Sequence, residues 1–204
     1  MQILIFFSLC LIYGSLSARE ITIKPFISNQ PLVLHKAMLD SDHTVEISTF
    51  KVYVCSIKEL EKKVHLLELE ENFSFTISDD KQTLIFGIDS NQTVNTTFSD
   101  ALDPIHGMFW TWNAGYINCK IEGIFTHANN VRTEFQLHLG GYRFPHATAH
   151  AILLPKSEKD INIELDIQPC LDYMIKQKVF KVMMPGKDAK VLSDRLYSSI
   201  RISN

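Results

Sequence analysis

The sequence is short of three things: paired cysteines, charge of one dominant sign and long apolar runs. Four cysteines occur in 204 residues, none of them in a Cys-x-x-Cys pair, so a thiolate zinc or redox motif is not supported. Twenty basic and 23 acidic residues are mixed along the chain, which excludes the basic patch typical of nucleic-acid-binding proteins. The chain also lacks a Gly-x-Ser-x-Gly elbow, a glycine-rich phosphate loop and a clear carboxylate pair, so no common hydrolase class is indicated.

The one long apolar run lies at the N-terminus, over Ile3–Tyr13. Small residues follow it as far as Ala18, and the charged pair Arg19-Glu20 comes next. This arrangement is typical of a secretory signal peptide, and the run is too short for a comfortable bilayer span. The sequence therefore predicts a signal peptide over residues 1–18, no membrane span, and a soluble protein that is periplasmic or secreted.

Three cysteines remain behind the predicted signal peptide: Cys55, Cys119 and Cys170. An odd number in an oxidising compartment allows at most one disulfide and leaves one free thiol. Cys55 and Cys119 each lie inside an apolar run. The favoured interpretation is that they are small buried side chains and not partners in a bridge.

The rest of the chain has the pattern of short strands separated by turns. Apolar and β-branched residues recur in short runs, with Asp, Asn, Ser, Gly and Pro between them. This pattern predicts an all-β fold, an antiparallel β-sandwich or barrel-like sandwich, as a single domain over residues 19–204. The predicted strands are Glu20–Phe26, Thr44–Ile57, Val64–Leu69, Phe73–Ile77, Thr83–Ile88, Gly107–Glu122, Arg132–Leu139, Thr148–Leu154 and Asp160–Ile167.

Three further segments depart from the strand pattern. Over Asp188–Ile200, apolar residues recur at helical spacing after a Pro-Gly pair, which predicts a short C-terminal helix that caps the sheet. Ser56–Lys63 is short and charged, and we expect a turn or an excursion between strands there. For Leu171–Val182 the pattern leaves the secondary structure open.

Both tryptophans of the chain lie one residue apart, in the segment His106-Gly107-Met108-Phe109-Trp110-Thr111-Trp112. Because side chains alternate between the two faces of a strand, an extended segment would place His106, Met108 and both tryptophans in one row. An imidazole, a thioether and two large π systems are suitable surroundings for a soft metal such as copper. The alternative interpretation is an aromatic strand that packs in a β core.

Three of the eight histidines are candidate ligands. His138 ends a predicted strand just before a Gly-Gly pair, which allows close backbone approach; the alternative is a surface histidine. His106 lies in the loop before the tryptophan strand, and the alternative for it is a solvated loop residue. His65 lies at the start of a predicted strand and could face inward. His146 and His150 have zinc-ligand spacing for a helix, but the strand pattern around them argues against one.

Several short motifs, each present once, follow one another along the chain. The most specific combines Leu102-Asp103-Pro104, Gly107–Asn118 with its Trp-Thr-Trp-Asn-Ala-Gly-Tyr core, and Glu122-Gly123. The others are Phe50–Ser56, Val64–Glu70, Phe86–Ser90 with Asn95, Phe135–Gly141 and Met183–Gly186. Taken together, over nearly the whole mature chain, they resemble the MbnP-like copper-binding family, exported bacterial proteins associated with methanobactin operons.

The resemblance implies an all-β copper-binding domain. In relatives a tryptophan is oxidised to kynurenine and copper sits between that group and histidines, so Trp110 or Trp112 would be the modified residue. His138 and His65 match recurrent histidines of the family, whereas His106 fills a position that often holds other residues in relatives. The resemblance also implies a di-haem, MauG-type peroxidase as the modifying partner.

The resulting interpretation is an exported protein that binds, stores or hands over copper and is not an enzyme. An alternative from another class is a non-metal β-sandwich interaction module of the cell envelope, which would bind a protein or glycan through exposed aromatic residues. An enzyme is the third alternative, and the absence of a nucleophile–base motif argues against it.

Overall fold

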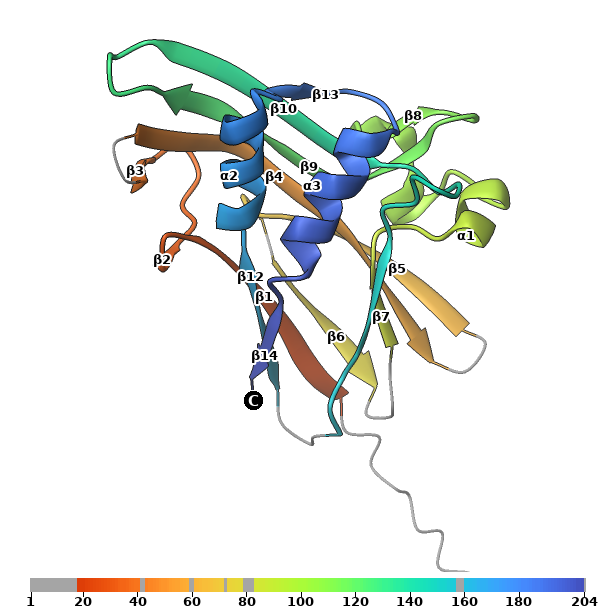
Figure 1. Ribbon diagram of the computed structural model, residues 1–204. Coiled ribbons are helices and arrows are strands. Elements are labelled where there is room, and N and C mark those ends of the chain that lie inside the picture. The colour runs from red at the N-terminus through yellow and green to blue at the C-terminus, as the bar shows by residue number, and fades with distance from the viewer. Residues whose placement is uncertain are drawn as a thin grey trace, which may run out of the picture.

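The computed structural model describes residues 18–40, 43–58, 61–71, 73–78, 83–156 and 160–203. The predicted signal peptide falls on residues 1–18 and, except for Ala18, lies outside the described residues, so its cleavage stays a prediction. The described chain forms two β-sheets that pack face to face, with helices against one side (Figure 1). The predicted all-β sandwich with a C-terminal helix is confirmed.

The larger sheet has the strand order β11-β7-β4-β9-β10-β13, and β3 and β5 also pair with β4. Its long central strands are rich in valine, isoleucine and aromatic residues, which favour extended backbone. β4 and β9 pair antiparallel, with Val52 opposite Cys119. The strands are β3 (Ala37–Asp40), β4 (His43–Lys58), β5 (Glu61–Glu68), β7 (Thr83–Phe86), β8 (Phe109–Thr111, which pairs with β9), β9 (Gly115–Thr126), β10 (Arg132–Gly140), β11 (His150–Leu153) and β13 (Lys181–Val182).

The smaller sheet has the order β14-β12-β1-β2, and β6 also pairs with β1. The pairing is not antiparallel throughout, because β1 and β12 run parallel, with Ile21 opposite Ile161. Parallel neighbours need a long crossover connection, and every strand of the larger sheet except β13 lies between these two strands in the sequence. The strands are β1 (Ala18–Ile27), β2 (Gln30–Pro31), β6 (Ser74–Ser78), β12 (Ile161–Asp166) and β14 (Arg201–Ser203).

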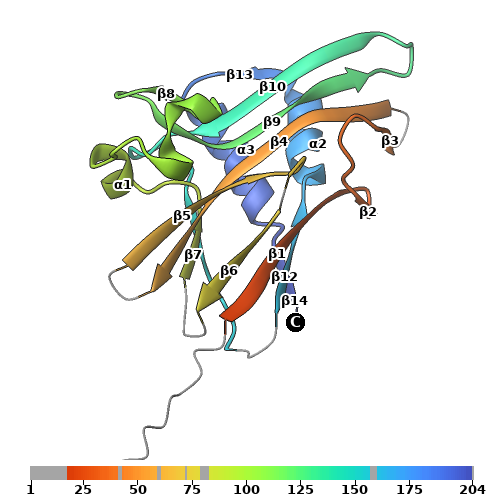
Figure 2. The ribbon, with the colours of Figure 1, turned by 180° about the vertical axis from the view of Figure 1, so that it is seen from behind.

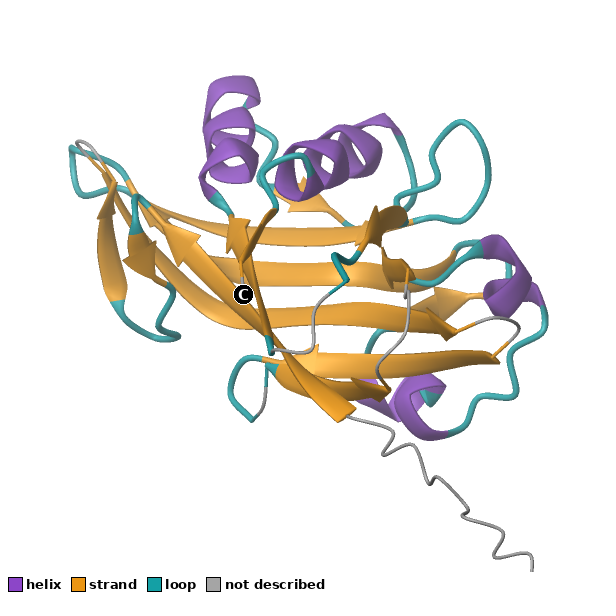
Figure 3. Cartoon of the chain, turned by 90° about the horizontal axis from the view of Figure 1, so that it is seen from below, coloured by secondary structure: helices purple, strands orange, loops and turns teal. Residues whose placement is uncertain are grey.

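The main core lies between the facing surfaces of the two sheets, which appear as layers in Figure 3. On the larger sheet, Val52 and Leu137 belong to this inner face and are fully buried. Because side chains alternate along a strand, the residues next to them in the sequence point the other way. We call that side the outer face; it carries Tyr53, Lys120 and His138.

The three cysteines at positions 55, 119 and 170 are fully buried and unbridged, as the interpretation as small buried side chains predicted for Cys55 and Cys119. Burial raises the pKa of Cys55, and it raises the pKa of Cys170 to about 12. The thiols therefore stay protonated at neutral pH and are poor nucleophiles and metal ligands.

Two helices close one side of the sandwich. α2 (Gln168–Gln177) packs against α3 (Lys187–Tyr197), and α3 contacts both β10 and β12, so it bridges the two sheets (Figure 1). The predicted helix over Asp188–Ile200 is thus present but shorter, and Leu171–Val182 consists of the main part of α2 followed by β13. No helix among the described residues is long and apolar enough to cross a membrane.

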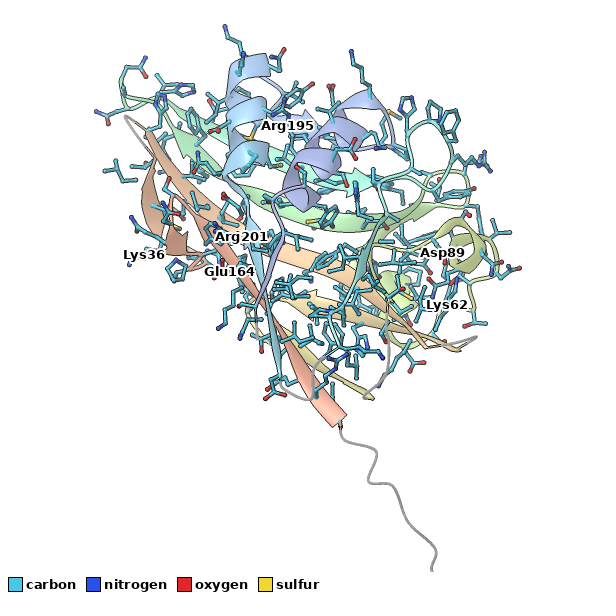
Figure 4. All side chains as sticks on the ribbon, turned by 60° about the horizontal axis from the view of Figure 1, so that its bottom comes forward. Lys36, Lys62, Asp89, Glu164, Arg195 and Arg201 are labelled. Carbon is cyan, nitrogen blue, oxygen red and sulfur yellow. The ribbon has the colours of Figure 1, made fainter. Side chains whose placement is uncertain are left out.

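The segment Ser56–Lys63, expected to be a turn or an excursion, largely belongs to strands. β4 continues to Lys58 and β5 begins at Glu61, and the two pair antiparallel. Lys62 of β5 forms an ion pair with Asp89 (Figure 4), whose carboxylate also accepts a hydrogen bond from the backbone N–H of Gln92 at 2.8 Å and so caps α1 (Ser90–Val94). The charges of this segment therefore anchor the helix that follows β7.

A buried asparagine ties three segments together. The Oδ1 of Asn118 accepts from the backbone N–H of Ile88 at 2.9 Å, and its Nδ2 donates to Thr148 Oγ1 at 2.9 Å. The backbone oxygen of Thr148 in turn accepts from Ser193 Oγ of α3 at 2.8 Å. The end of β7, the strand β9 and the segment after β10 are thus fixed to one another through a single side chain.

Replacement of Asn118 by alanine is expected to lower the free energy of unfolding by about 2–3 kcal/mol, because it leaves the buried N–H of Ile88 unpaired and removes the hydrogen bond to Thr148. Urea denaturation followed by circular dichroism measures the change. Asn95→Ala is the matched control, since the Asn95 side chain bonds only to Asn91 at an exposed position. Equal stability of the two variants would contradict a structural role for the Asn118 bonds.

Candidate metal site on the outer face

The tryptophan segment is a hairpin. The predicted strand Gly107–Glu122 divides into the short β8 (Phe109–Thr111) and β9, which pair antiparallel. At the start of β9, Gly115 has φ +78°, a left-handed conformation that side chains disfavour. A Cβ on Gly115 would also lie 2.8 Å from Cδ1 of the Tyr142 ring. Glycine at this position therefore permits the turn between β8 and β9. The alternating strand pattern of the sequence did not reveal this turn.

The turn separates the residues that were expected in one row. Met108 is fully buried, whereas Trp112 lies in the turn with 62% of its surface exposed. His106 belongs to the 3-10 helix η2 (Pro104–His106), which ends at Gly107 before the strand begins. The expectation of a single row of His106, Met108 and both tryptophans is therefore wrong.

Trp110 belongs to a second apolar cluster, on the outer face of the larger sheet. We call it the outer cluster; β8 and α1 lie at this end of the sheet (Figure 2). A Cβ on Gly140 would lie 2.7 Å from Cζ3 of the Trp110 ring, so the ring lies directly on the backbone of β10. The indole Nε1 is buried and has no hydrogen-bond partner among the described residues. The cluster consists of Tyr53, Ile88, Met108, Tyr116 and Ile117, with Val64, Leu66, Phe98, Ala101, Leu102, Phe109 and Trp110 packed against it.

His138 lies two residues before Gly140 on the same strand and is only 5% exposed. Its Nε2 lies 2.6 Å from Oε1 of Glu122, on the neighbouring strand β9. Because a carboxylate only accepts, the imidazole donates from Nε2, which leaves Nδ1 with a lone pair. This Nδ1 is buried and has no hydrogen-bond partner among the described residues.

The surroundings of His138 favour its neutral form. Burial lowers the pKa of the imidazole, the hydrogen bond to Glu122 opposes the change, and the ammonium group of Lys120 lowers the pKa further. Lys120 is directly opposite His138 in the β9–β10 register. A neutral imidazole with a fixed tautomer is the form that binds metal ions.

The other two candidate histidines lie apart from His138. His65 stacks on Phe75 with a ring distance of 4.4 Å, and it is opposite Val54 in the sheet, so it lies on the inner face. The larger sheet separates it from His138. His106, at the end of η2, is half-exposed, and its Nε2 donates to the backbone oxygen of Asp100 at 3.0 Å.

His146 and His150, which have the spacing of zinc ligands on a helix, do not lie on one. The strand pattern around them had already argued against a helix. His146 lies in the segment after β10, whereas His150 begins β11 and pairs with Asp194 of α3 at 2.9 Å. Over the part of the chain that the structure describes, no three His, Cys, Asp or Glu side chains come close enough to hold a metal ion.

One residue of this arrangement, Glu122, had no role assigned from the sequence, and it orients His138. Gly140, expected from the sequence to allow a close approach, makes room for the Trp110 ring. A carboxylate within the apolar run of β9 was the available signal for Glu122. Its partner depends on the register of β9 and β10, in which Glu122 is diagonal to His138.

Comparison with family models identifies one family for this chain. The family model MbnP matches residues 17–184. A solved structure, MbnP from Methylosinus trichosporium, is 14% identical, with a TM-score of 0.49, and the match covers 73% of this chain and 75% of that one. No curated protein sequence matches the chain. Because the family model spans well over half of the sequence, the chain belongs to the MbnP family.

Proposed function

We propose that this protein binds copper on the outer face of the larger sheet, between Trp110 and His138, as an exported carrier or store that turns over no substrate. One observation carries the proposal. Two buried ring nitrogens, Nδ1 of His138 and Nε1 of Trp110, lack hydrogen-bond partners among the described residues. Buried polar atoms are nearly always paired, so two unpaired ones in the same region favour a missing ligand.

The donor chemistry fits copper at His138 and only partly at Trp110. Imidazole nitrogen suits copper, and Glu122 would hold the ring so that Nδ1 is the binding atom. An indole N–H only donates, so unmodified tryptophan offers no lone pair for a metal. Oxidation of the ring to kynurenine would expose an aromatic amine and a carbonyl oxygen, in keeping with the family resemblance.

Trp110 is the better candidate for that modification than Trp112. Its ring lies on Gly140, two residues from His138, whereas Trp112 lies in the turn and packs against Phe98 at a ring distance of 4.7 Å. The oxidant is external in this proposal, and a di-haem peroxidase of the MauG type is the proposed partner. Of the remaining histidines, His106 is the one nearest to Trp110 in the sequence. His65 is not included in the proposed copper site, because it lies on the inner face.

His138→Ala is expected to lower copper affinity at least tenfold, because it removes the one preorganised imidazole. Metal analysis after dialysis, together with a competition titration, measures the change. His127→Ala is the matched control, since the Nε2 of His127 bonds to Thr133 near the far end of β9. Unchanged affinity in a folded His138→Ala variant would refute this site.

Peptide mass mapping of the same samples identifies the modified tryptophan. Conversion to kynurenine removes one carbon and adds one oxygen, and the affected peptide distinguishes position 110 from position 112. We expect the change at Trp110, and loss of copper with it in Trp110→Phe but not in Trp112→Phe. Modification at Trp112 alone would contradict the proposed geometry.

A further inference from the structure

Exposed apolar side chains gather on three loops at one end of the molecule. Among the described residues ten large apolar side chains are exposed, and four of them belong to these loops. Phe144 is 96% exposed, Met184 69%, Trp112 62% and Met183 39%. Single exposed apolar residues are common, whereas a group of them indicates an interaction surface. We call residues 111–114, 141–149 and 183–186 the loop surface.

Direct contacts hold the three loops together. The hydroxyl of Tyr142 donates to the backbone oxygen of Trp112 at 3.4 Å, which joins the first loop to the second. A Cβ on Gly141 would lie 3.0 Å from Cβ of Pro185, so the second loop lies against the third. Figure 1 shows β8, the segment after β10 and the beginning of α3 on the same side of the molecule.

The loop surface has a charge opposite to that of the whole chain. The net charge of the protein is −3, yet the three loops contain no aspartate or glutamate. They carry Arg143 and also His146. The third loop leads into α3, whose first two residues, Lys187 and Asp188, have opposite charges. The guanidinium group of Arg143 lies 5.0 Å from the centre of the Tyr142 ring, so a cation and an aromatic side chain are placed side by side.

We propose that the loop surface docks onto an anionic lipid membrane. Tryptophan and tyrosine prefer the boundary between lipid and water, and cations near the surface attract anionic headgroups. The exposed apolar side chains belong to separate loops. A fluid lipid interface accommodates such an arrangement, whereas a protein partner would need a rigid surface of matching shape. The proposal does not depend on copper binding.

The test is binding of the purified protein to sedimenting vesicles of phosphatidylcholine, with or without phosphatidylglycerol. We expect stronger binding to the anionic vesicles, weakened by salt. The double variant Phe144→Asp with Met184→Asp is expected to lower binding about tenfold, because it removes apolar insertion and adds negative charge. Leu153→Asp is the matched control, since Leu153 is 70% exposed on β11 and lies outside the loop surface.

Each contrary outcome overturns the proposal. Absence of binding to anionic vesicles would refute the membrane as the ligand and would favour a protein partner for the loop surface. Equal binding by the double variant would assign membrane attachment to another part of the chain, including a retained N-terminal segment. Equal binding to neutral and anionic vesicles would exclude the anionic headgroup as the ligand. Circular dichroism of each variant confirms that the protein compared is folded.

Discussion

Alanine in place of Gly123 is expected to lower the free energy of unfolding by about 3 kcal/mol. A Cβ at this position would lie 2.1 Å from the backbone oxygen of Glu46 and 2.9 Å from Cζ of Phe135. The first of these atoms belongs to the backbone of β4, so the strands themselves would have to separate. Glycine inside a strand marks such a close backbone approach, and here the β4–β9 pairing shifts register between Ile47 and Thr49.

Gly186→Ala is the matched control for this substitution. No atom lies within 4 Å of the Cβ position of Gly186, and its φ of 170° is extended backbone that any residue adopts. We expect its stability to stay within about 0.5 kcal/mol of the original protein. Urea unfolding of both variants gives the comparison. Similar stabilities would mean that β4 and β9 are not in close contact at Gly123.

Acidification from pH 7 to pH 4 is expected to destabilise the protein through His65. Burial lowers the pKa of this imidazole from 6.5 to about 4, and the neighbouring Lys63 adds to the effect. Between these two values the unfolded chain binds a proton at His65 that the folded chain does not. Stability is therefore complete above pH 6.5 and is lost as the pH falls toward 4, by about 2 kcal/mol after allowance for partial exposure.

Phenylalanine in place of His65 removes the titrating group and preserves a ring that stacks on Phe75. The variant is expected to lose less stability than the original protein between pH 7 and pH 4.5, as measured by urea unfolding at each pH. His35→Asn is the control, since the His35 side chain is 61% exposed. An unchanged pH dependence in His65→Phe would show that another group controls acid sensitivity.

The strands were largely predictable from the sequence, and the relations between them were not. The alternating pattern of Arg132–Leu139 corresponds closely to β10, and the apolar spacing over Asp188–Ile200 identified α3. The hairpin at Gly115 was missed, because a strand pattern carries no record of a positive φ angle. The pairing of His138 with Glu122 needed the β9–β10 register, which no local pattern determines.

The parallel pairing of β1 with β12 has a consequence for the order in which the chain folds. β2 follows β1 directly and pairs with it, and β6 pairs with it from the first half of the chain, whereas the other long edge of β1 waits for residues 161–166. A nascent chain therefore keeps an unsaturated strand edge until most of its synthesis is complete. Contacts of such high sequence separation form slowly, and unpaired edges invite association with other chains. Protection of the N-terminal segment by a holding chaperone would suit a chain with this topology.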